Sequence, residues 1–411
     1  MKKKSAFLNF IKRFVLGVVV LIALVYGVVY LGHKVFFKIP FSDKPTIAAL
    51  NQDGFSLDAA SHEQPQTMEA YVEVLSRQVK NYNKHLDAYW PNNPQKNQYV
   101  IAKSLNEQEA YLIAPDGVIK RMSKPEFDSY NVSSFNMDGQ WCPFNINDIE
   151  GAYIPVSPEG LKNYYVFQKY YHLGTYDQFL SYSHELFHSI TQERWAGPTG
   201  IAYGNADRDE RFNDSSARRT RMLLQQQLTA AICDDSNREK YIKEAVSTYK
   251  AYRKNNKTDY DAALFFDRIE GTAYYYELVS ALYAGYPDQI KNQNDMYKAL
   301  KVILADDRPA YRTIGVVSEG YKVGGFASIL LDLLAIENNE DPMEWKKDIE
   351  KDYYLTPMLI LEKKYENQLL PEPKSIPTQT EYDRWIAGKY EIAPEASLTS
   401  RIFTILYGII F

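Results

Sequence analysis

The sequence predicts an α+β protein, in which a small mixed or antiparallel sheet is followed by a mainly helical lobe. One N-terminal transmembrane helix is expected ahead of both parts. Three observations support this class. An unbroken apolar run lies near the N-terminus, short β-like runs occupy residues 98–171, and apolar residues recur at helical spacing from residue 175 onward.

The membrane prediction rests on residues 14–31, FVLGVVVLIALVYGVVYL, which carry no charge. A helix of this length just crosses a hydrocarbon core of about 30 Å. Basic residues are denser before the run than after it, so the N-terminus is expected in the cytoplasm and the body outside the cell membrane. A cleaved signal peptide is the alternative, but the run is long for a signal core and no small-x-small cleavage site follows it.

Residues 35–65 contain three prolines and predict a stem, and residues 67–89 fit one amphipathic helix. Strands are expected at 98–104, 110–115, 118–123, 151–157 and 163–171. The tripeptide Pro115-Asp116-Gly117 predicts a hairpin turn, because proline fixes φ and glycine tolerates a positive φ. The last apolar residues, 402–411, are too few to span a bilayer and predict a buried terminal strand or short helix, with contact to the membrane as the alternative.

The second half of the sequence predicts successive helices. Thr175 and Gln178 form a capping-box pattern at the start of the first helix, which Gly197 and Pro198 should end. A second capping pattern, Ser236 and Glu239, opens a later helix. The remaining helices are expected at 215–233, 259–282, 292–304 and 322–336.

The composition argues against nucleic acid as a binding partner and against a zinc site built from cysteines. The net charge of -5 is small and no Lys/Arg-rich block interrupts the body, which argues against nucleic acid. Cys142 and Cys233 are the only cysteines and cannot form a structural zinc site alone. They could form one disulfide, although two unpaired thiols are the preferred interpretation.

The most informative stretch is His184-Glu185-Leu186-Phe187-His188, an H-E-x-x-H motif. Residues four apart lie on one face of a helix, so both imidazoles can reach one Zn²⁺ ion. Glu185 would then accept a proton from a water that the metal activates. Chance occurrence on a surface helix is the alternative, which the surrounding helical pattern disfavours.

A catalytic zinc site needs a third protein ligand and one open position. No histidine follows His188, so the ligand must be a carboxylate, and Glu270 stands out because small residues beside it would let two helices pack closely. Glu277 is the rival, since it lies seven residues on and on the same face. A buried Glu270 paired with Arg268 or Arg218 would be a purely structural alternative.

HELFH followed by a helix bearing E-G-x-A-x-Y resembles the gluzincin class of zinc metallopeptidases, and most closely its poorly characterised bacterial membrane-anchored members. The resemblance is sharp over residues 177–195 and 268–277 and weaker over 215–335. It implies that His184, His188 and Glu270 bind zinc and that Glu185 is the general base.

The sequence departs from the gluzincin pattern in two places. Tyr274 stands where thermolysin-like members carry an acidic residue that orients a zinc histidine, so the partners of the ligands must differ here. The long interval between His188 and Glu270 predicts an inserted helical hairpin.

The resulting hypothesis is a membrane-anchored, extracytoplasmic zinc metallopeptidase with a peptide or protein substrate. Tyr321 and Tyr275 are the expected donors to the oxyanion, and residues 151–157 are the expected edge strand for an extended substrate. Gly324-Gly325 could line the cleft, but a close helix contact is preferred. The alternatives are a non-catalytic envelope or cell-surface protein that retains the fold, which the presence of Glu185 disfavours, and hydrolysis of a non-peptide amide or ester.

These expectations divide the chain into four parts. They are a cytoplasmic tail with the transmembrane anchor at 1–34, the stem at 35–65, a zincin-like catalytic domain at 66–370 and a C-terminal extension packed on that domain at 371–411.

Overall fold

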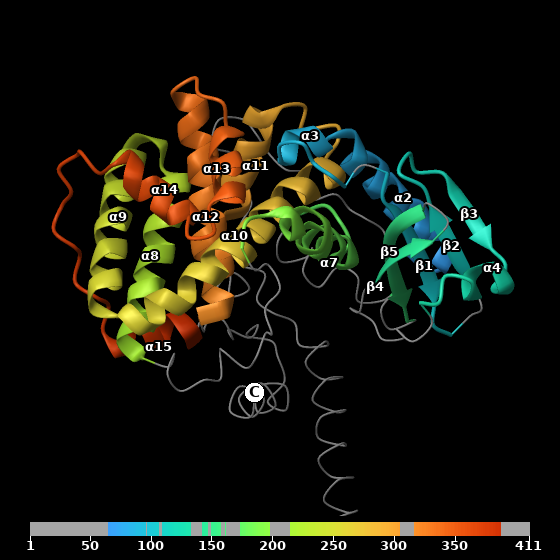
Figure 1. The fold of residues 1–411 in the computed structure, drawn as a ribbon, viewed down its shortest axis with the longest axis horizontal. Coiled ribbons are helices and arrows are strands. Elements are labelled where there is room, and N and C mark those ends of the chain that lie inside the picture. The colour runs from blue at the N-terminus through green and yellow to red at the C-terminus, as the bar shows by residue number, and fades with distance from the viewer. Residues whose placement is uncertain are drawn as a thin grey trace, which may run out of the picture. The chain divides into compact units, whose positions relative to one another are not determined.

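The computed structural model describes residues 65–95, 97–106, 109–132, 142–146, 149–157, 161, 173–197, 214–304 and 316–387. These residues all belong to one compact unit, Thr46–Lys389. In it a five-stranded sheet is combined with a larger helical part, as the α+β prediction states (Figure 1). The predicted anchor, the strand at 163–171 and the apolar C-terminus lie outside the described residues. None of the helices within the described ranges is long and apolar enough to cross a membrane.

The sheet is mixed, with strand order β3-β2-β1-β5-β4. Its strands are β1 (Tyr99–Ser104), β2 (Ala110–Ile113), β3 (Ile119–Met122), β4 (Cys142–Ile146) and β5 (Ile149–Val156). The β1–β5 pair is parallel and the other three pairs are antiparallel. The predicted hairpin between β2 and β3 is present, and Gly117 adopts a φ of 85° that a residue with a Cβ rarely takes.

The expectation that residues 151–157 form an edge strand is wrong. These residues belong to β5, which lies between β1 and β4, and β4 is the strand at the end of the sheet. The sequence-based signal for β4 was weak, because Pro143 and Asn145 lower the β-propensity of this short strand. Pro155 lies beyond the part of β5 that pairs with β4, so it needs a ladder partner only on the β1 side.

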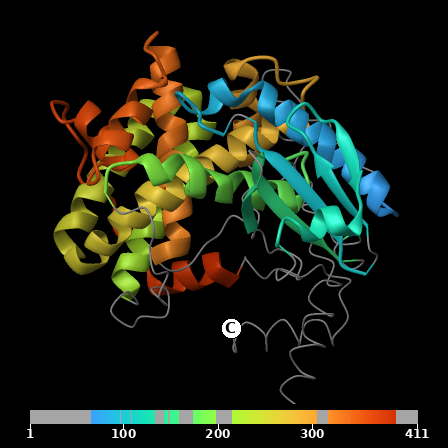
Figure 2. The ribbon, with the colours of Figure 1, turned by 45° about the vertical axis from the view of Figure 1, so that its right-hand side comes forward.

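Helices pack on the sheet and on one another. The first group comprises α2 (Met68–Lys84), α3 (Leu86–Tyr89), α4 (Lys124–Asp128) and α7 (Asp177–Leu186). The second comprises α8 (Ser215–Cys233), α9 (Arg238–Asn255), α10 (Lys257–Gly285), α11 (Gln293–Leu304), α12 (Val316–Glu337), α13 (Glu344–Lys351), α14 (Pro357–Lys364) and α15 (Gln379–Ala387). Figure 2 shows α2 lying along the sheet, where it contacts β1, β2 and β3. The helices α8 and α9 pack against each other in the interval between His188 and Glu270, where the sequence predicted two helices.

Both predicted capping patterns are wrong, although the helices themselves are present. The helix α7 begins at Asp177 after Tyr176, with no side-chain cap, and Thr175 lies one position too early to cap it. Likewise α9 follows Asn237 rather than Ser236. Both helices obtain their stability from burial of apolar side chains against neighbouring elements, which local capping patterns do not report.

The centre of the helical part is α10, which is buried around most of its surface and contacts α12, α7, α2 and α11. A Cβ on Gly324 would lie 1.9 Å from the backbone oxygen of Asp267, and one on Gly271 would lie 2.4 Å from the Cα of Gly324. The two backbones therefore touch, which confirms Gly324 as a close helix contact. The small residues beside Glu270 were expected to face the motif helix, but Gly271 faces α12 instead.

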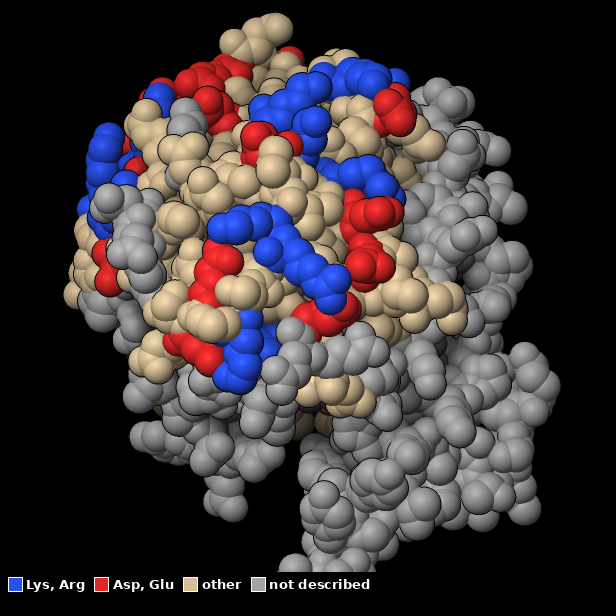
Figure 3. Space-filling view, turned by 90° about the vertical axis from the view of Figure 1, so that its right-hand side faces the viewer, with Lys and Arg blue, Asp and Glu red and all other residues tan. Residues whose placement is uncertain are grey.

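The surface near the sheet is highly charged. Exposed ion pairs join Lys120 with Glu126 at 2.6 Å and Lys124 with Asp128 at 2.5 Å. Figure 3 shows basic and acidic side chains intermixed on the face that it presents. At the opposite end of the sequence, α15 contacts α8, and Arg219 Nη1 donates to the backbone oxygen of Pro377 at 2.9 Å.

Candidate metal centre

The H-E-x-x-H motif lies where α7 changes its winding. His184 and Glu185 belong to the last turn of α7, whereas His188 belongs to a π-helical turn, Phe187–Thr191. A short 3₁₀ turn, Gln192–Arg194, follows. The sequence predicted a regular helix as far as Gly197, and this part of the prediction is wrong. Single π turns are rare and are often found at functional sites.

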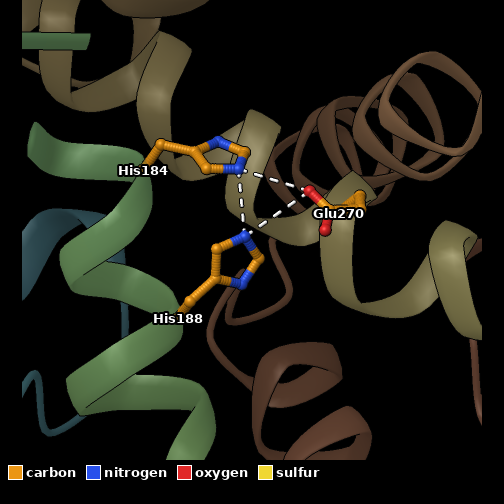
Figure 4. Close-up of side chains that lie close together, drawn as sticks. All are labelled: His184, His188 and Glu270. Carbon is orange, nitrogen blue, oxygen red and sulfur yellow. Dashed lines mark hydrogen bonds and ion pairs between the residues drawn. The ribbon is translucent and has the colours of Figure 1, made fainter. Parts of the chain in front are cut away.

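Two ligand-bearing segments meet at the motif. Figure 4 shows His184 and His188 on one side, pointing toward Glu270 on α10. The two histidine Nε2 atoms are 3.0 Å apart. Oε2 of Glu270 lies 3.3 Å from Nε2 of His184 and 3.5 Å from Nε2 of His188. Among the described residues, these three form the group whose ligand atoms could share one metal ion.

The spacing of the three atoms fits zinc. Zinc bonds to imidazole nitrogen and carboxylate oxygen are about 2.0–2.2 Å long, and a tetrahedral arrangement then separates neighbouring ligand atoms by about 3.3–3.6 Å. The observed separations of 3.0, 3.3 and 3.5 Å lie at or just below this range. Two nitrogens and one oxygen leave a fourth tetrahedral position open, which is the donor set of a catalytic zinc site.

The electrostatics of the centre favour a cation. Burial alone would lower the pKa of His184, but the hydrogen bonds to Glu270 and Glu277 outweigh it and raise the pKa to about 10. Burial alone would likewise raise the pKa of Glu270, yet the hydrogen bonds from His184 and His188 hold it far below its usual range. The buried carboxylate is therefore negative, and a metal ion would supply the positive charge that His184 otherwise carries.

The alternative role for Glu270, an ion pair with Arg268 or Arg218, does not match the contacts of these two arginines. Arg218 forms its ion pairs with Asp259 and Glu319. The guanidinium of Arg268 donates to two backbone oxygens, one of them that of Ile349 at 2.8 Å. The carboxylate of Glu270 instead contacts both motif histidines.

Each motif histidine has a second partner on its outer nitrogen. Oε2 of Glu277 lies 3.0 Å from Nδ1 of His184. Oε1 of Gln192 lies 2.6 Å from Nδ1 of His188. Glu277, the rival ligand, thus occupies the orienting position of an outer partner. The sequence left both roles unassigned, although the spacing of Gln192 four residues after His188 was a usable signal.

The position that breaks the gluzincin pattern has its own environment. The hydroxyl of Tyr274 accepts a hydrogen bond from Nζ of Lys322 at 2.6 Å, and the same ammonium lies 4.1 Å from the centre of the tyrosine ring. The orienting carboxylate is supplied three residues later by Glu277. On a helix these positions differ by about 60° in direction, so both lie on the side of α10 that carries Glu270.

The two predicted oxyanion donors lie in different places. The ring of Tyr321 stacks on the imidazole of His184 with a centroid distance of 5.4 Å and an interplanar angle of 7°. The hydroxyl of Tyr275 instead donates to Asp332 within a fully buried cluster and accepts from Lys346 at 2.9 Å. Five residues of helix turn Tyr275 about 140° away from Glu270. The structure places Tyr321 against His184 of the candidate metal centre and holds Tyr275 in the core.

A pocket of about 790 Å³ opens beside the motif. Its walls include the partly buried side chains of Glu185 and His188, the 3₁₀ turn that follows them, and residues of β4 and β5 such as Phe144 and Gly151. The general base predicted from the sequence therefore faces a space large enough for several residues of a peptide. No protein-family model, curated protein or solved structure matches this chain.

Proposed function

We propose that this protein is a zinc metallopeptidase with a zincin-like helical lobe, held at the cell membrane by residues 14–31 with its active site outside the cytoplasm. One observation carries the proposal. Three ligand atoms of His184, His188 and Glu270 converge at separations that suit tetrahedral zinc, and Glu185 lines the adjoining pocket. The resemblance of the HELFH motif and the Glu270 helix to gluzincins supports the same proposal.

The chemistry follows from the roles of these residues. When bound, zinc lowers the pKa of a water molecule to about 7 and polarises the carbonyl to be attacked. Glu185 accepts the proton of that water and passes it to the nitrogen of the departing amine. Tyr321, which lies against His184, donates a hydrogen bond to the oxyanion without adding a charge.

The sheet offers a way to bind an extended peptide. Pocket-lining residues of β4 include Pro143, Phe144 and Asn145, and β4 is the last strand of the described sheet. A peptide added beside β4 would run past His188 and Glu185 with its backbone paired to the strand. Only the strand assigned to this role differs from the sequence-based expectation.

The test uses the full-length protein in detergent micelles. Zinc is measured by elemental analysis, and hydrolysis is followed on a mixed peptide library by mass spectrometry. The wild type should hold one zinc ion per chain and cleave peptides. Glu185→Gln should retain zinc and lose about 10²- to 10⁴-fold in rate. Glu193→Gln, an exposed carboxylate in the same pocket, is the matched control and should retain most of the activity.

Two results would contradict the proposal. A folded wild type that takes up no zinc would remove the metal centre. A wild type that binds zinc but cleaves no peptide, with Glu185→Gln indistinguishable from it, would favour the non-catalytic envelope protein. Cleavage of simple esters or amides without peptides would favour the third hypothesis.

A further inference from the structure

The side chain of Gln192 joins the two ligand-bearing segments. It is fully buried, and its Oε1 lies 2.6 Å from Nδ1 of His188. Its Nε2 donates to the backbone oxygen of Ile269 at 2.8 Å and to Oγ1 of Thr272 at 2.9 Å, both on α10. One amide therefore contacts the ring of one ligand and the backbone next to another, Glu270.

The contacts determine which way the amide points. The backbone oxygen of Ile269 can only accept, so the nitrogen of Gln192 must face it. The hydroxyl of Thr272 donates to the backbone oxygen of Arg268 at 2.7 Å, which leaves the hydroxyl oxygen to accept from Gln192. Both amide hydrogens are then used on α10, and the amide oxygen is left to face His188.

The amide in turn determines the tautomer of His188. An amide oxygen only accepts, so Nδ1 of His188 must carry a hydrogen. In the neutral ring, Nε2 then has a free lone pair, and Nε2 is the atom that faces His184 and Glu270. This is the form that binds zinc.

The two histidines differ in the charge of their outer partners. His184 has the carboxylate of Glu277, whereas His188 has a neutral amide. With Glu270 and Glu277 ionised, zinc with neutral histidines gives a centre with no net charge. A carboxylate at position 192 would make this buried centre negative and would oppose the backbone oxygen of Ile269.

We propose that Gln192 is a positioning residue, which fixes the Nδ1–H tautomer and the ring orientation of His188 and ties this ligand to α10. The proposal rests on zinc binding at the site described above. It predicts that the metal geometry depends on an amide that does not touch the metal.

The first test compares zinc affinities of full-length variants by competition with a chromophoric chelator. Gln192→Ala should bind zinc about 10- to 100-fold more weakly than the wild type. Gln95→Ala is the matched control, because Gln95 is also fully buried and donates to Thr191, the neighbour of Gln192, at 3.0 Å, while its amide oxygen accepts from the hydroxyl of Tyr82. Gln95→Ala should change the zinc affinity by less than about threefold, even if it lowers the melting temperature as much as Gln192→Ala does.

The second test reads the tautomer directly from ¹⁵N chemical shifts of labelled histidines in the metal-free protein. His188 should show protonated Nδ1 in the wild type and in Gln192→Glu, which retains an acceptor. Gln192→Ala should show a mixture of tautomers. If Gln192→Ala fails to fold, Thr272→Val takes its place. It removes one of the two hydrogen-bond acceptors of the Gln192 amide on α10 and should also increase the fraction of the other His188 tautomer.

The outcomes separate this inference from the proposed function. A wild type without zinc affinity overturns the peptidase proposal and the metal role of Gln192 together, whatever tautomer His188 shows. A wild type that binds zinc while Gln192→Ala binds it equally well, with the same His188 tautomer, overturns the role of Gln192 alone.

Discussion

Glu277 lies 3.0 Å from Nδ1 of His184, and Glu270 lies 3.3 Å from Nε2 of the same ring. The imidazole is thus held between two carboxylates that are seven residues apart on α10. Seven residues make almost two helical turns, so both side chains project toward α7. The carboxylate of Glu270 also lies near Nε2 of His188, at the candidate metal position. The carboxylate of Glu277 contacts Nδ1 of His184, the ring nitrogen that faces away from that position.

This arrangement predicts different results for the two glutamates. Glu270→Gln replaces a charged ligand with a neutral one and should abolish stoichiometric zinc binding. Glu277→Gln keeps an acceptor next to His184 but removes its charge, and should weaken zinc binding by about 10- to 100-fold. Chelator competition on the purified proteins measures both affinities. Equal losses in the two variants would contradict the assignment of inner ligand and outer partner.

Substitutions of Tyr321 and Tyr275, the two predicted oxyanion donors, should have different effects. Tyr321→Phe keeps the ring that stacks on His184 and removes only the hydroxyl, so kcat should fall by about 10²- to 10³-fold while zinc content and melting temperature stay close to the wild type. Steady-state kinetics on a cleaved peptide measures this change. A wild-type rate for Tyr321→Phe would exclude the hydroxyl as the oxyanion donor.

Tyr275→Phe should affect stability instead of rate. Its hydroxyl is buried against Asp332 and Lys346, and its removal leaves these charged groups with one partner fewer. The expected loss in free energy of unfolding is about 1–3 kcal/mol, measured by urea denaturation. A large fall in kcat with unchanged stability would place Tyr275 in the reaction after all.

Gly324→Ala tests the contact between α10 and α12. The new methyl group would lie 1.9 Å from the backbone oxygen of Asp267, and neither backbone can move without displacing Glu270 three residues on. We expect a loss of about 1–3 kcal/mol in unfolding free energy together with weaker zinc binding. Gly325→Ala is the milder comparison, because its methyl group would lie 2.8 Å from the ring of Tyr274 and 3.2 Å from the nearest backbone atom, the oxygen of Gly271. Equal stability of the two variants would contradict the close-contact interpretation.

Cys233 provides a prediction on pH. It is a free thiol in the structure, and burial, opposed in part by Lys301, raises its pKa to about 12. An exposed thiol has a pKa of about 8.5, so at pH 8 the native thiolate fraction is about 10⁻⁴ against about one quarter in the unfolded chain. Alkylation by iodoacetamide in a Cys142→Ser variant should be at least about 10³-fold slower in the native protein. Because the folded pKa is the higher one, stability falls as pH rises from about 8.5 toward 12. Equal alkylation rates would show that Cys233 is accessible.

The fold was predictable where the signal is periodic or local. Residues 215–233 form α8 as expected, and the hairpin at Gly117 follows from the conformational freedom of glycine. The prediction failed where contacts with a neighbouring element determine whether a strand forms or where a helix begins. The strand β4 has weak propensity of its own and exists by pairing with β5, and the start of α7 depends on packing rather than on a cap.

The sequence alone indicated His184 and His188 as candidate ligands and Glu185 as the candidate base, because a spacing of four residues places two imidazoles on one helical face. The absence of later histidines also led to the expectation that the third ligand is a downstream carboxylate. Only the tertiary structure decided between Glu270 and Glu277, and only it showed Gln192 between His188 and α10. These choices depend on how α10 lies against α7, and helix packing is set by contacts between residues far apart in the chain.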